Sequence, residues 1–200
     1  MYHRFVKGKN MSRDIWIISD THFNHANMLK FTDWTGGLTR PGFRDVEHMN
    51  EMMMDNWNSV VKPGDKVYHL GDVVMGLDSE DWMKKNWPRL NGSKRLIVGN
   101  HDDIKMLSKG GFFSKVQLWR PFMEFGLLLS HVPLHKSSLL RPKNSDGDTP
   151  IAKDDTDAWA TVLNVHGHIH SNPSPEGPYR NVSVEQINYT PINIEELRII

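Results

Sequence analysis

The sequence contains no cysteine, which excludes disulfide bonds and zinc sites built on thiolate ligands and is typical of a reducing compartment. Long apolar runs are also missing: stretches such as IWII at 15–18 and LLL at 127–129 fall far short of the ~20 residues that span a bilayer. The first residues, MYHRFVKGKNMSRD, lack the apolar core of a signal peptide. These absences predict a cytoplasmic protein with no membrane partner.

An excess of charge of one sign is missing as well, since 24 basic residues balance 24 acidic ones. The chain therefore offers no broad cationic surface, and nucleic acid is a possible but not a favoured partner. An apolar content of 38% with seven Trp and eight Phe indicates a folded chain, and its 200 residues fit a single domain spanning 1–200. The unusual feature is the number of histidines, which is eleven.

Short apolar runs alternate with amphipathic segments along the chain. The predicted strands span 14–19, 66–72, 94–100, 125–131 and 160–167, and a further strand is predicted at 179–187. The predicted helices span 45–60, with Asp45 as N-cap, 78–87 and 102–110. This order indicates a layered α/β fold with a mixed sheet. We expect a flexible N-terminus at 1–12 and a long polar loop at 136–158, near the site or partly disordered.

Polar residues of one chemical kind follow the predicted strands. They are Asp20 and His22, Asp72, Asn100 and His101, His131, and His168 and His170. In open α/β sheets ligands bind beyond the carboxyl ends of the strands, so these side chains are expected at one rim. Carboxylate, amide and imidazole ligands without sulfur suit Mn²⁺, Fe or Zn²⁺. Seven ligands from this set would be too many for one ion and would fit two, with Asp72 as the candidate carboxylate bridging them.

The ordered motifs Asp-x-His, Gly-Asp, Gly-Asn-His-Asp, His and Gly-His-x-His resemble those of the calcineurin-like metallophosphoesterases. They run from Asp20 to His170, about three quarters of the chain. The resemblance implies a four-layer αββα sandwich with mixed β-sheets, and two divalent metal ions at the carboxyl ends of the strands. Among metals we expect Mn²⁺ first, with Fe, Zn²⁺ and Ni²⁺ as alternatives.

The resemblance also implies individual roles. One metal would be held by Asp20, His22 and His170, the second by Asn100, His131 and His168, and Asp72 would bridge the two. His101 would bind no metal and would contact the phosphate or protonate the leaving group as a general acid. His166, in the same LNVHGHIH stretch, would not be a ligand.

The sequence departs from the protein-phosphatase branch of that family, which has Asp and Arg after its Gly-Asp motif. Here GDVVMG has Met75 and Gly76, which argues against a protein phosphatase and leaves His101 without that carboxylate partner. Asp102 or Asp103 is expected either to orient His101 or to cap the following helix.

Three further residues are hypothetical contacts of the substrate. His25 and Asn27 follow the first motif in DTHFNHAN, where parts of the family have a comparable His-x-Asn, and they are expected to support a metal ligand or touch the substrate. Arg40 precedes the first helix, and its guanidinium is suited to clamping a phosphate.

The resemblance implies a metal-dependent phosphoesterase, and we expect it to act on small phosphodiesters or nucleotides, with a hydroxide that bridges the two metals attacking phosphorus. A phosphomonoesterase and a nuclease of the same family are the alternatives among enzymes. A catalytically inactive scaffold on the same fold is the alternative from another class. The complete ligand set and the presence of His101 favour the enzyme.

Overall fold

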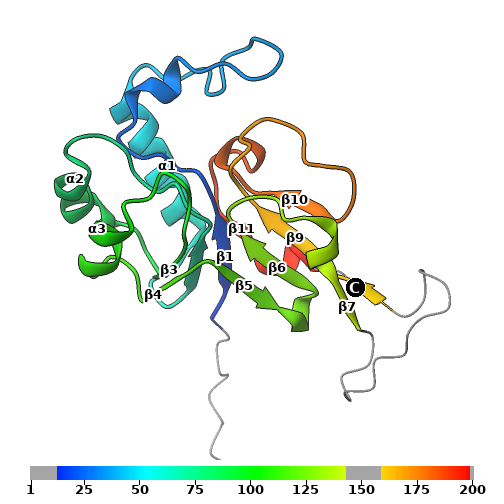
Figure 1. Cartoon of the computed structure of the whole chain (residues 1–200). Helices are drawn as coiled ribbons and strands as arrows, with labels where there is room; N and C mark the ends of the chain where they lie inside the picture. The colour runs from blue at the N-terminus through cyan, green and yellow to red at the C-terminus, as the bar shows by residue number, and fades with distance from the viewer. Residues whose placement is uncertain (1–12, 143–158, 199–200) are drawn as a thin grey trace, which may run out of the picture.

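The computed structural model describes residues 13–142 and 159–198 (Figure 1). Two mixed β-sheets lie at its centre, and a separate two-stranded ribbon pairs β7 (Leu140–Pro142) with β8 (Trp159–Thr161). The expected flexible segment 1–12 and most of the expected loop 136–158 fall outside the described residues. The described start of that loop forms a 3-10 helix, η4 (Lys136–Leu139), followed by β7.

The first sheet has the strand order β11-β1-β2-β3-β4. Its strands are β1 (Ile15–Ile18), β2 (Lys66–His69), β3 (Ser93–Ile97), β4 (Lys115–Gln117) and β11 (Ile192–Asn193). β1 to β4 are parallel, and β11 pairs with β1 in the antiparallel sense. Ile18 packs toward the helices and Ile17 toward the second sheet, which explains why the IWII run is apolar throughout.

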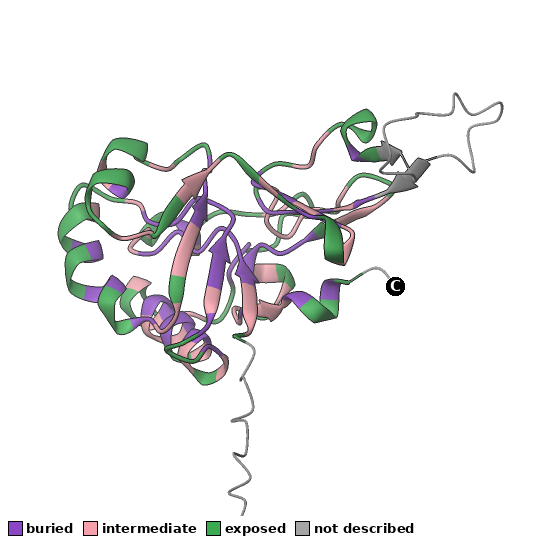
Figure 2. Cartoon of the chain, turned by 90° about the horizontal axis from the view of Figure 1, so that it is seen from below, coloured by how far each residue is buried: buried purple, intermediate pink, exposed green. Residues whose placement is uncertain are grey.

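Three helices cover the outer face of the first sheet: α1 (Val46–Val60), α2 (Ser79–Asn86) and α3 (Ile104–Lys109). The carboxylate of Asp45 accepts a hydrogen bond from the His48 N–H, and that of Asp103 accepts one from the Met106 N–H. Figure 2 shows buried residues along the central strands and on the inward sides of the helices, with exposed residues outside. The three helices predicted from the sequence are therefore confirmed to within about two residues at their ends.

The second sheet has the order β10-β9-β6-β5, with β5 antiparallel to β6 and the other pairs parallel. Its strands are β5 (Trp119–Phe122), β6 (Leu127–Ser130), β9 (Leu163–His166) and β10 (Tyr179–Asn181). Leu129 and Val165 share a core between the two sheets with Tyr68 of β2 and with Leu70, which follows β2. The layered α/β class with two mixed sheets is thus confirmed.

The outer face of the second sheet differs in detail from the expected fourth layer of helix. In the described residues after Lys109 the helical segments are 3-10 helices of three or four residues. The loop after β6 lies against this face, since the Leu134 N–H donates to the Asn164 side chain and the Tyr179 hydroxyl donates to the Leu134 carbonyl. None of the helices in the described ranges is both long and apolar enough to cross a bilayer.

The strand predicted at 179–187 is wrong in its second half. β10 ends at Asn181, and a 3-10 helix, η5 (Val184–Gln186), takes the place of the rest. Ser183 leaves the second sheet because it pairs with Ser19 at the end of β1 and donates from its hydroxyl to the Asp20 carboxylate. The short strands β4, β5 and β11 were not predicted, because two to four residues carry little periodicity.

The substitution Met53→Ala tests the helix-to-sheet packing. Met53 is 1% exposed in the core beneath α1, whereas its neighbour Met52 is half-buried. We expect Met53→Ala to lower the free energy of unfolding by about 2–5 kcal/mol, since it removes a buried side chain and leaves a cavity. Urea titration followed by circular dichroism measures the change, with Met52→Ala as the matched control. Equal losses in the two variants would contradict the described register of α1.

Candidate metal centre

The predicted metal ligands meet at one edge of the two sheets, where β1, β2, β3, β6 and β9 end. They form two groups, in each of which one ligand atom per residue lies within 4.8 Å of the others: Asp20, His22 and His170 in the first, and Asp72, His131 and His168 in the second. Two ligands on opposite sides of one ion are about 4.2 Å apart at ordinary metal–ligand distances of about 2.1 Å. The spacing within each group therefore fits one ion.

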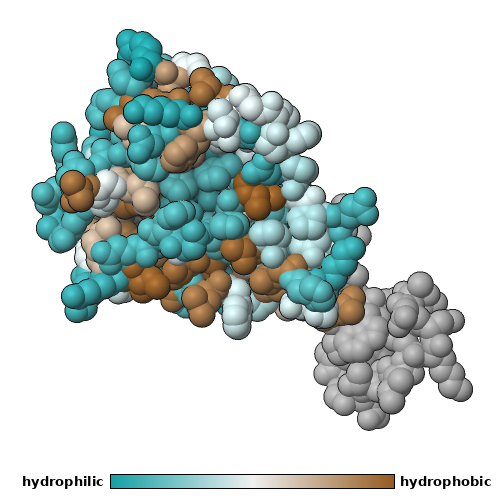
Figure 3. Space-filling view, turned by 45° about the horizontal axis from the view of Figure 1, so that its top comes forward, coloured by the Kyte–Doolittle hydropathy of each residue, from teal (hydrophilic) through white to brown (hydrophobic). Residues whose placement is uncertain are grey.

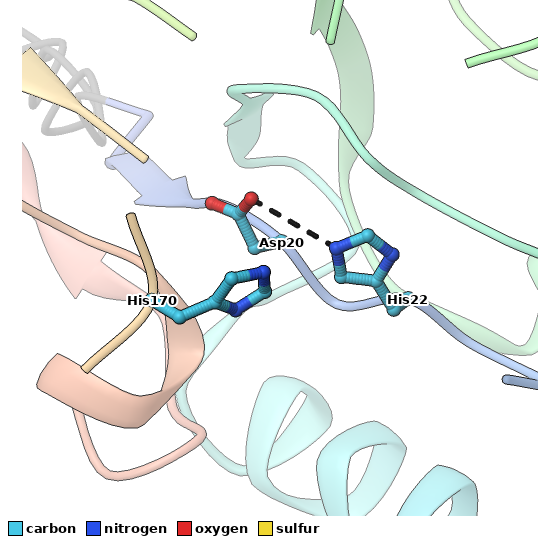
Figure 4. A group of neighbouring side chains, drawn as sticks. All are labelled: Asp20, His22 and His170. Carbon is cyan, nitrogen blue, oxygen red and sulfur yellow. Dashed lines mark ion pairs between the residues drawn. The ribbon is translucent and has the colours of Figure 1, made fainter. Parts of the chain in front are cut away.

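In the first group the three side chains point toward one another (Figure 4). His22 Nε2 lies 4.0 Å from Asp20 Oδ1. The other carboxylate oxygen, Asp20 Oδ2, accepts hydrogen bonds from the His168 N–H at 2.8 Å and the Ser183 hydroxyl at 3.0 Å. One oxygen of Asp20 is thus held by the protein, and the other faces the centre of the group.

In the second group Asn100 joins the three residues. Asn100 Oδ1 lies 2.8 Å from His131 Nε2 and 2.9 Å from His168 Nδ1. His131 donates from Nδ1 to the Leu70 carbonyl at 2.7 Å, which leaves its Nε2 as the nitrogen that faces the group. This arrangement brings together all the residues that the family resemblance assigned to the second metal.

Asp72 lies between the two groups. Its Oδ2 is 3.6 Å from His22 Nε2 and 3.5 Å from His131 Nε2. Its Oδ1 accepts a hydrogen bond from the His101 N–H at 2.9 Å, which fixes the orientation of the carboxylate. The position between a ligand of each group is the one that a bridging carboxylate requires.

The polar atoms of the first group fit a bound cation. Asp20 is fully buried, and its Oδ1 has no hydrogen-bond partner in the described residues. The same holds for both ring nitrogens of His22, and burial lowers the pKa of this imidazole so far that it is neutral at pH 7. Burial likewise raises the pKa of Asp20 above its usual value. Unpaired buried groups of this kind are costly, and a divalent ion coordinated by both atoms would remove the cost.

The backbone of the ligands is strained. Asp20, His22, Asp72, His168 and His170 all have φ between +44° and +71°, the left-handed region that residues other than glycine seldom adopt. Each such residue costs of order 1–3 kcal/mol, and such residues persist only where the surrounding structure holds them in place. Five of them within one set of ligands point to a functional site.

Glycines before the ligands allow the loops to approach closely. A Cβ on Gly167 would collide with the side chains of Ser19 and Asp20, and one on Gly99 would collide with Asp72. Gly71 has φ +98°, and a Cβ there would meet the backbone of Gly99. The sequence analysis found the ligands that follow these glycines, and the structure explains why no larger residue fits before them.

A buried ion pair that the sequence analysis missed supports the first group. Glu185 Oε1 accepts hydrogen bonds from Arg40 Nε at 2.7 Å and from His170 Nδ1 at 3.1 Å, so His170 Nε2 is free to face the metal position. Burial lowers the pKa of His170, but the hydrogen bond to Glu185 and its charge outweigh burial and raise the pKa. Glu185 carried no signal in the sequence because its segment NVSVEQI was interpreted as a strand.

Arg40 lies beneath the metal centre and not at its surface. Only 1% of it is exposed, and its two terminal nitrogens donate to the carbonyls of Thr21 and Asp20 at 2.8 Å and 2.5 Å. The expectation of a substrate contact is therefore wrong, because the whole guanidinium is occupied by Glu185 and the backbone of the first motif. Its role is to hold the loop that carries Asp20 and His22.

Three neighbouring residues, His101, Asp102 and Asp103, have different surroundings in the structure. His101 is exposed beside the first group, with its ring centroid 5.9 Å from that of His22. The Asp102 carboxylate accepts from the N–H groups of Asp72, Val73 and Gly99, so it joins the loops after β2 and β3 and does not bind the His101 ring. Asp103 caps α3.

His25 and Asn27 come from the same motif, but only His25 lies beside the metal centre. His25 lines a cavity of about 270 Å³ beside the metal centre, together with His22, His101 and His170. Asn27 is exposed in a 3-10 helix, η1 (Ala26–Leu29), and is not among the residues that line this cavity. His166 is fully buried, with Nδ1 donating to the Gly167 carbonyl and Nε2 near the Ser174 hydroxyl, and it faces neither ligand group.

Comparison with known proteins assigns the chain to a family. The sequence profile of the calcineurin-like phosphoesterases matches residues 13–198. The chain belongs to this family. This confirms the resemblance found in the motifs. The family typically has a dinuclear metal centre, and each of the two ligand groups could hold one metal ion.

Several individual proteins are similar to this calcineurin-like phosphoesterase. The uncharacterized protein MJ1445 of Methanocaldococcus jannaschii is 34% identical over 190 residues, which cover 92% of this chain and 88% of MJ1445. The Gene 66 protein of Mycobacterium phage L5 is 27% identical over 78% of this chain and 77% of its own. Among crystal structures, the protein of unknown function AQ665 from Aquifex aeolicus is 27% identical, with a TM-score of 0.62 over 92% of this chain and 97% of its own.

The substitution Gly167→Ala tests the close approach at the first group. The added methyl group would collide with the Asp20 carboxylate, so we expect the metal content of Mn²⁺-treated protein to fall while the far-ultraviolet circular dichroism is kept. Metal per chain is measured by atomic emission after gel filtration. Gly64→Ala is the control, because nothing lies within 4 Å of a Cβ there. Full metal content in Gly167→Ala would contradict the described geometry.

The substitution Glu185→Gln tests the support of His170. The amide carries no charge for the Arg40 guanidinium or for the imidazole, and loss of such a supporting partner typically weakens metal affinity by 10–100-fold. We expect one of the two Mn²⁺ sites to weaken by about this factor, as measured by the electron paramagnetic resonance signal of free Mn²⁺. Glu124→Gln, at an exposed position, is the control. An unchanged binding isotherm would exclude the supporting role of Glu185.

Proposed function

We propose that this calcineurin-like phosphoesterase hydrolyses small phosphodiesters or nucleotides with the help of two divalent metal ions, Mn²⁺ being the preferred species. The observation that carries the proposal is the position of Asp72 Oδ2, at 3.6 Å from a histidine of one ligand group and 3.5 Å from a histidine of the other. Such a shared carboxylate is what a two-metal site needs.

Bound divalent ions would supply positive charge for the phosphate oxygens and lower the pKa of an attacking water. The chain's own part is to hold the ligands rigidly. Asp20 is fixed by the His168 N–H and the Ser183 hydroxyl, His170 by Glu185, and His131 by the Leu70 carbonyl. Because these partners are in place before substrate arrives, little reorganisation is needed during the reaction.

His101 is the proposed general acid. Its backbone N–H is held by Asp72, while its exposed ring lines the cavity beside the first ligand group. In the proposed step the attacking water first loses a proton to solvent. Its oxygen then forms a bond to phosphorus, the bond from phosphorus to the leaving oxygen breaks, and the proton of the His101 ring moves to the leaving oxygen. Histidine is well suited to this step near neutral pH.

The small cavity supports the proposed substrate size. Its volume of about 270 Å³ is slightly below the range of ~300–1,000 Å³ that is usual for drug-sized ligands, so it suits one small organic group. The balanced net charge gives no support for long contacts along a nucleic acid backbone. The inactive scaffold is disfavoured because the residues of both ligand groups are present and close together.

The substitution His101→Ala tests the proposed acid. We expect normal Mn²⁺ content, a loss of about 10²–10⁴-fold in kcat on alkyl phosphodiesters, and a much smaller loss on bis-p-nitrophenyl phosphate, whose leaving group needs no proton. Initial rates on both ester types measure the contrast. His48→Ala, on α1 and outside both ligand groups, is the control.

The same assays decide between the enzyme classes. Mono- and bis-p-nitrophenyl phosphate and cyclic and linear nucleotides are compared with Mn²⁺-loaded protein. Dominant turnover of the monoester would overturn the phosphodiesterase proposal, and absence of turnover on every ester would favour the scaffold. Equal activity of His101→Ala and the unmodified protein on alkyl esters would overturn the acid role.

A further inference from the structure

The cavity beside the first ligand group has two chemically different sides. The inner side is formed by His22, His101 and His170 of the metal centre. The outer side is formed by residues of the segment 25–39, mainly Met28 and Phe31, together with Met75 from the loop after β2. The metal centre needs only the inner side, so the apolar side has no part in the proposed hydrolysis itself.

Aromatic rings lead from the metal position into this apolar side. The ring centroids of His22 and His25 are 6.0 Å apart, and those of His25 and Phe31 are 5.8 Å apart. The His25 and Phe31 rings meet edge to face at 67°, an arrangement that rings adopt favourably. A flat group attached to a phosphate at the metals would therefore lie along these rings.

Polar atoms accompany the apolar ones at a few points. The Ser171 hydroxyl oxygen is buried and has no hydrogen-bond partner among the described residues, and Ser171 lines the cavity. Thr32 and Asp33 also line it, and Asp33 is kept ionised because hydrogen bonds from Thr35, among other groups, hold its pKa below the usual value. An apolar cavity with a few convergent polar groups is the usual form of a ligand site.

The segment 25–39 beside the cavity also carries exposed apolar residues that do not line it. Phe31, which lines the cavity, is 47% exposed, and Trp34, which does not, is 72% exposed. The segment stands out above the ends of the strands in Figure 1 (blue), and Figure 3 shows hydrophilic side chains filling the centre of this face with hydrophobic atoms gathered around them. A half-exposed Phe beside a metal centre is an apolar surface available to a bound ligand.

We propose that the cavity lined by His25, Met28, Phe31 and Met75 is the subsite for a flat, uncharged ring attached to the phosphate of the substrate. The inference rests on the proposed phosphoesterase function and names the class of ester it favours: aryl or nucleoside esters over alkyl esters. The ring packs against Phe31 and Met75, and a hydrogen-bonding edge of the ring meets Ser171. The phosphate stays at the metal centre on the inner side.

A series of esters with one leaving group tests the subsite. The probes are the O-methyl, O-phenyl and O-thymidine 5′-esters of S-ethyl phosphorothioate, whose leaving thiol carries no ring; release of ethanethiol by Mn²⁺-loaded protein is measured. We expect kcat/KM to be about tenfold higher for the phenyl ester than for the methyl ester, which corresponds to burying about 60 Å² of apolar surface. Phe31→Ala should abolish this preference and leave the methyl ester within about twofold. Trp34→Ala, in the same segment but outside the cavity, should keep the preference.

A binding measurement separates the subsite from the activity. Phenylphosphonate and methylphosphonate, which carry no ester bond, are titrated into Mn²⁺-loaded protein by calorimetry. We expect about tenfold tighter binding of phenylphosphonate, lost in Phe31→Ala and kept in Trp34→Ala. If the thymidine ester is also preferred over the methyl ester and loses this preference in Phe31→Ala, the natural ring is a nucleobase. If only the phenyl ester shows a preference that depends on Phe31, the natural ring is a simple aryl group.

The outcomes that overturn the inference differ from those that overturn the proposed function. Three outcomes overturn the subsite alone. They are turnover without a preference for the phenyl ester, a preference that remains in Phe31→Ala, and a preference that is lost equally in Trp34→Ala. Absence of turnover on all three esters overturns the proposed function, and the phosphonate pair then still decides the subsite. Equal affinity for the two phosphonates would overturn it.

Discussion

The burial of two carboxylates at one point is the constraint on which the rest of the structure depends. Asp20 and Asp72 are almost completely shielded from water, and His22 lies 4.0 Å from one and 3.6 Å from the other. No Lys or Arg side chain among the described residues is within 4.0 Å of either carboxylate. Buried carboxylates without a cationic partner are unfavourable, and bound divalent cations would remove this cost.

The loops that carry Asp20 and Asp72 are joined beneath the site by hydrogen bonds. The Asp102 carboxylate takes three backbone N–H groups from two loops, and the buried His69 links the Thr21 hydroxyl to the Gly71 N–H. Burial lowers the pKa of His69 to about 3, so it makes these bonds as a neutral ring. Arg40 adds bonds to two carbonyls of the loop after β1. These bonds hold in place the loops that contain five ligands with left-handed backbone.

The sequence predicted those parts of the site that are local in the chain. Each ligand follows an apolar strand and often a glycine, so its type and its place at the strand end could be inferred from a few neighbouring residues. Glu185 and Ser183 reach the site from a segment that is remote from Asp20 in the chain, and nothing near them in the sequence indicates that contact. Arg40 was misjudged because its chemistry suits phosphate, while burial, which decides its role, depends on packing against Glu185.

The ends of the helices and strands show the same difference between features that are local in the chain and contacts between distant segments. The long amphipathic α1 was predicted almost to its ends because its repeating buried face and the Asp45 cap are both local features. The end of β10 at Asn181 was not, because it is set by the pairing of Ser183 with Ser19 from another sheet. Contacts between distant segments therefore determine where short strands stop and which polar residues support the site.

The position of the cavity follows from how the segment 25–39 is attached. At its start Phe23 is fully buried and pairs with the loop after β2, and at its end Arg40 is fixed beneath Asp20. Both attachments belong to the same frame that holds the metal ligands. The middle of the segment is bonded mainly to itself, through the bridge of Thr32 to Leu38 and the bonds of Asp33. The exposed apolar side chains of this middle part, Phe31 and Trp34, can thus change without disturbing the ligands, whereas Met28 belongs to the buried core. On the proposed function, this segment would be the part of the chain that sets the choice of ester.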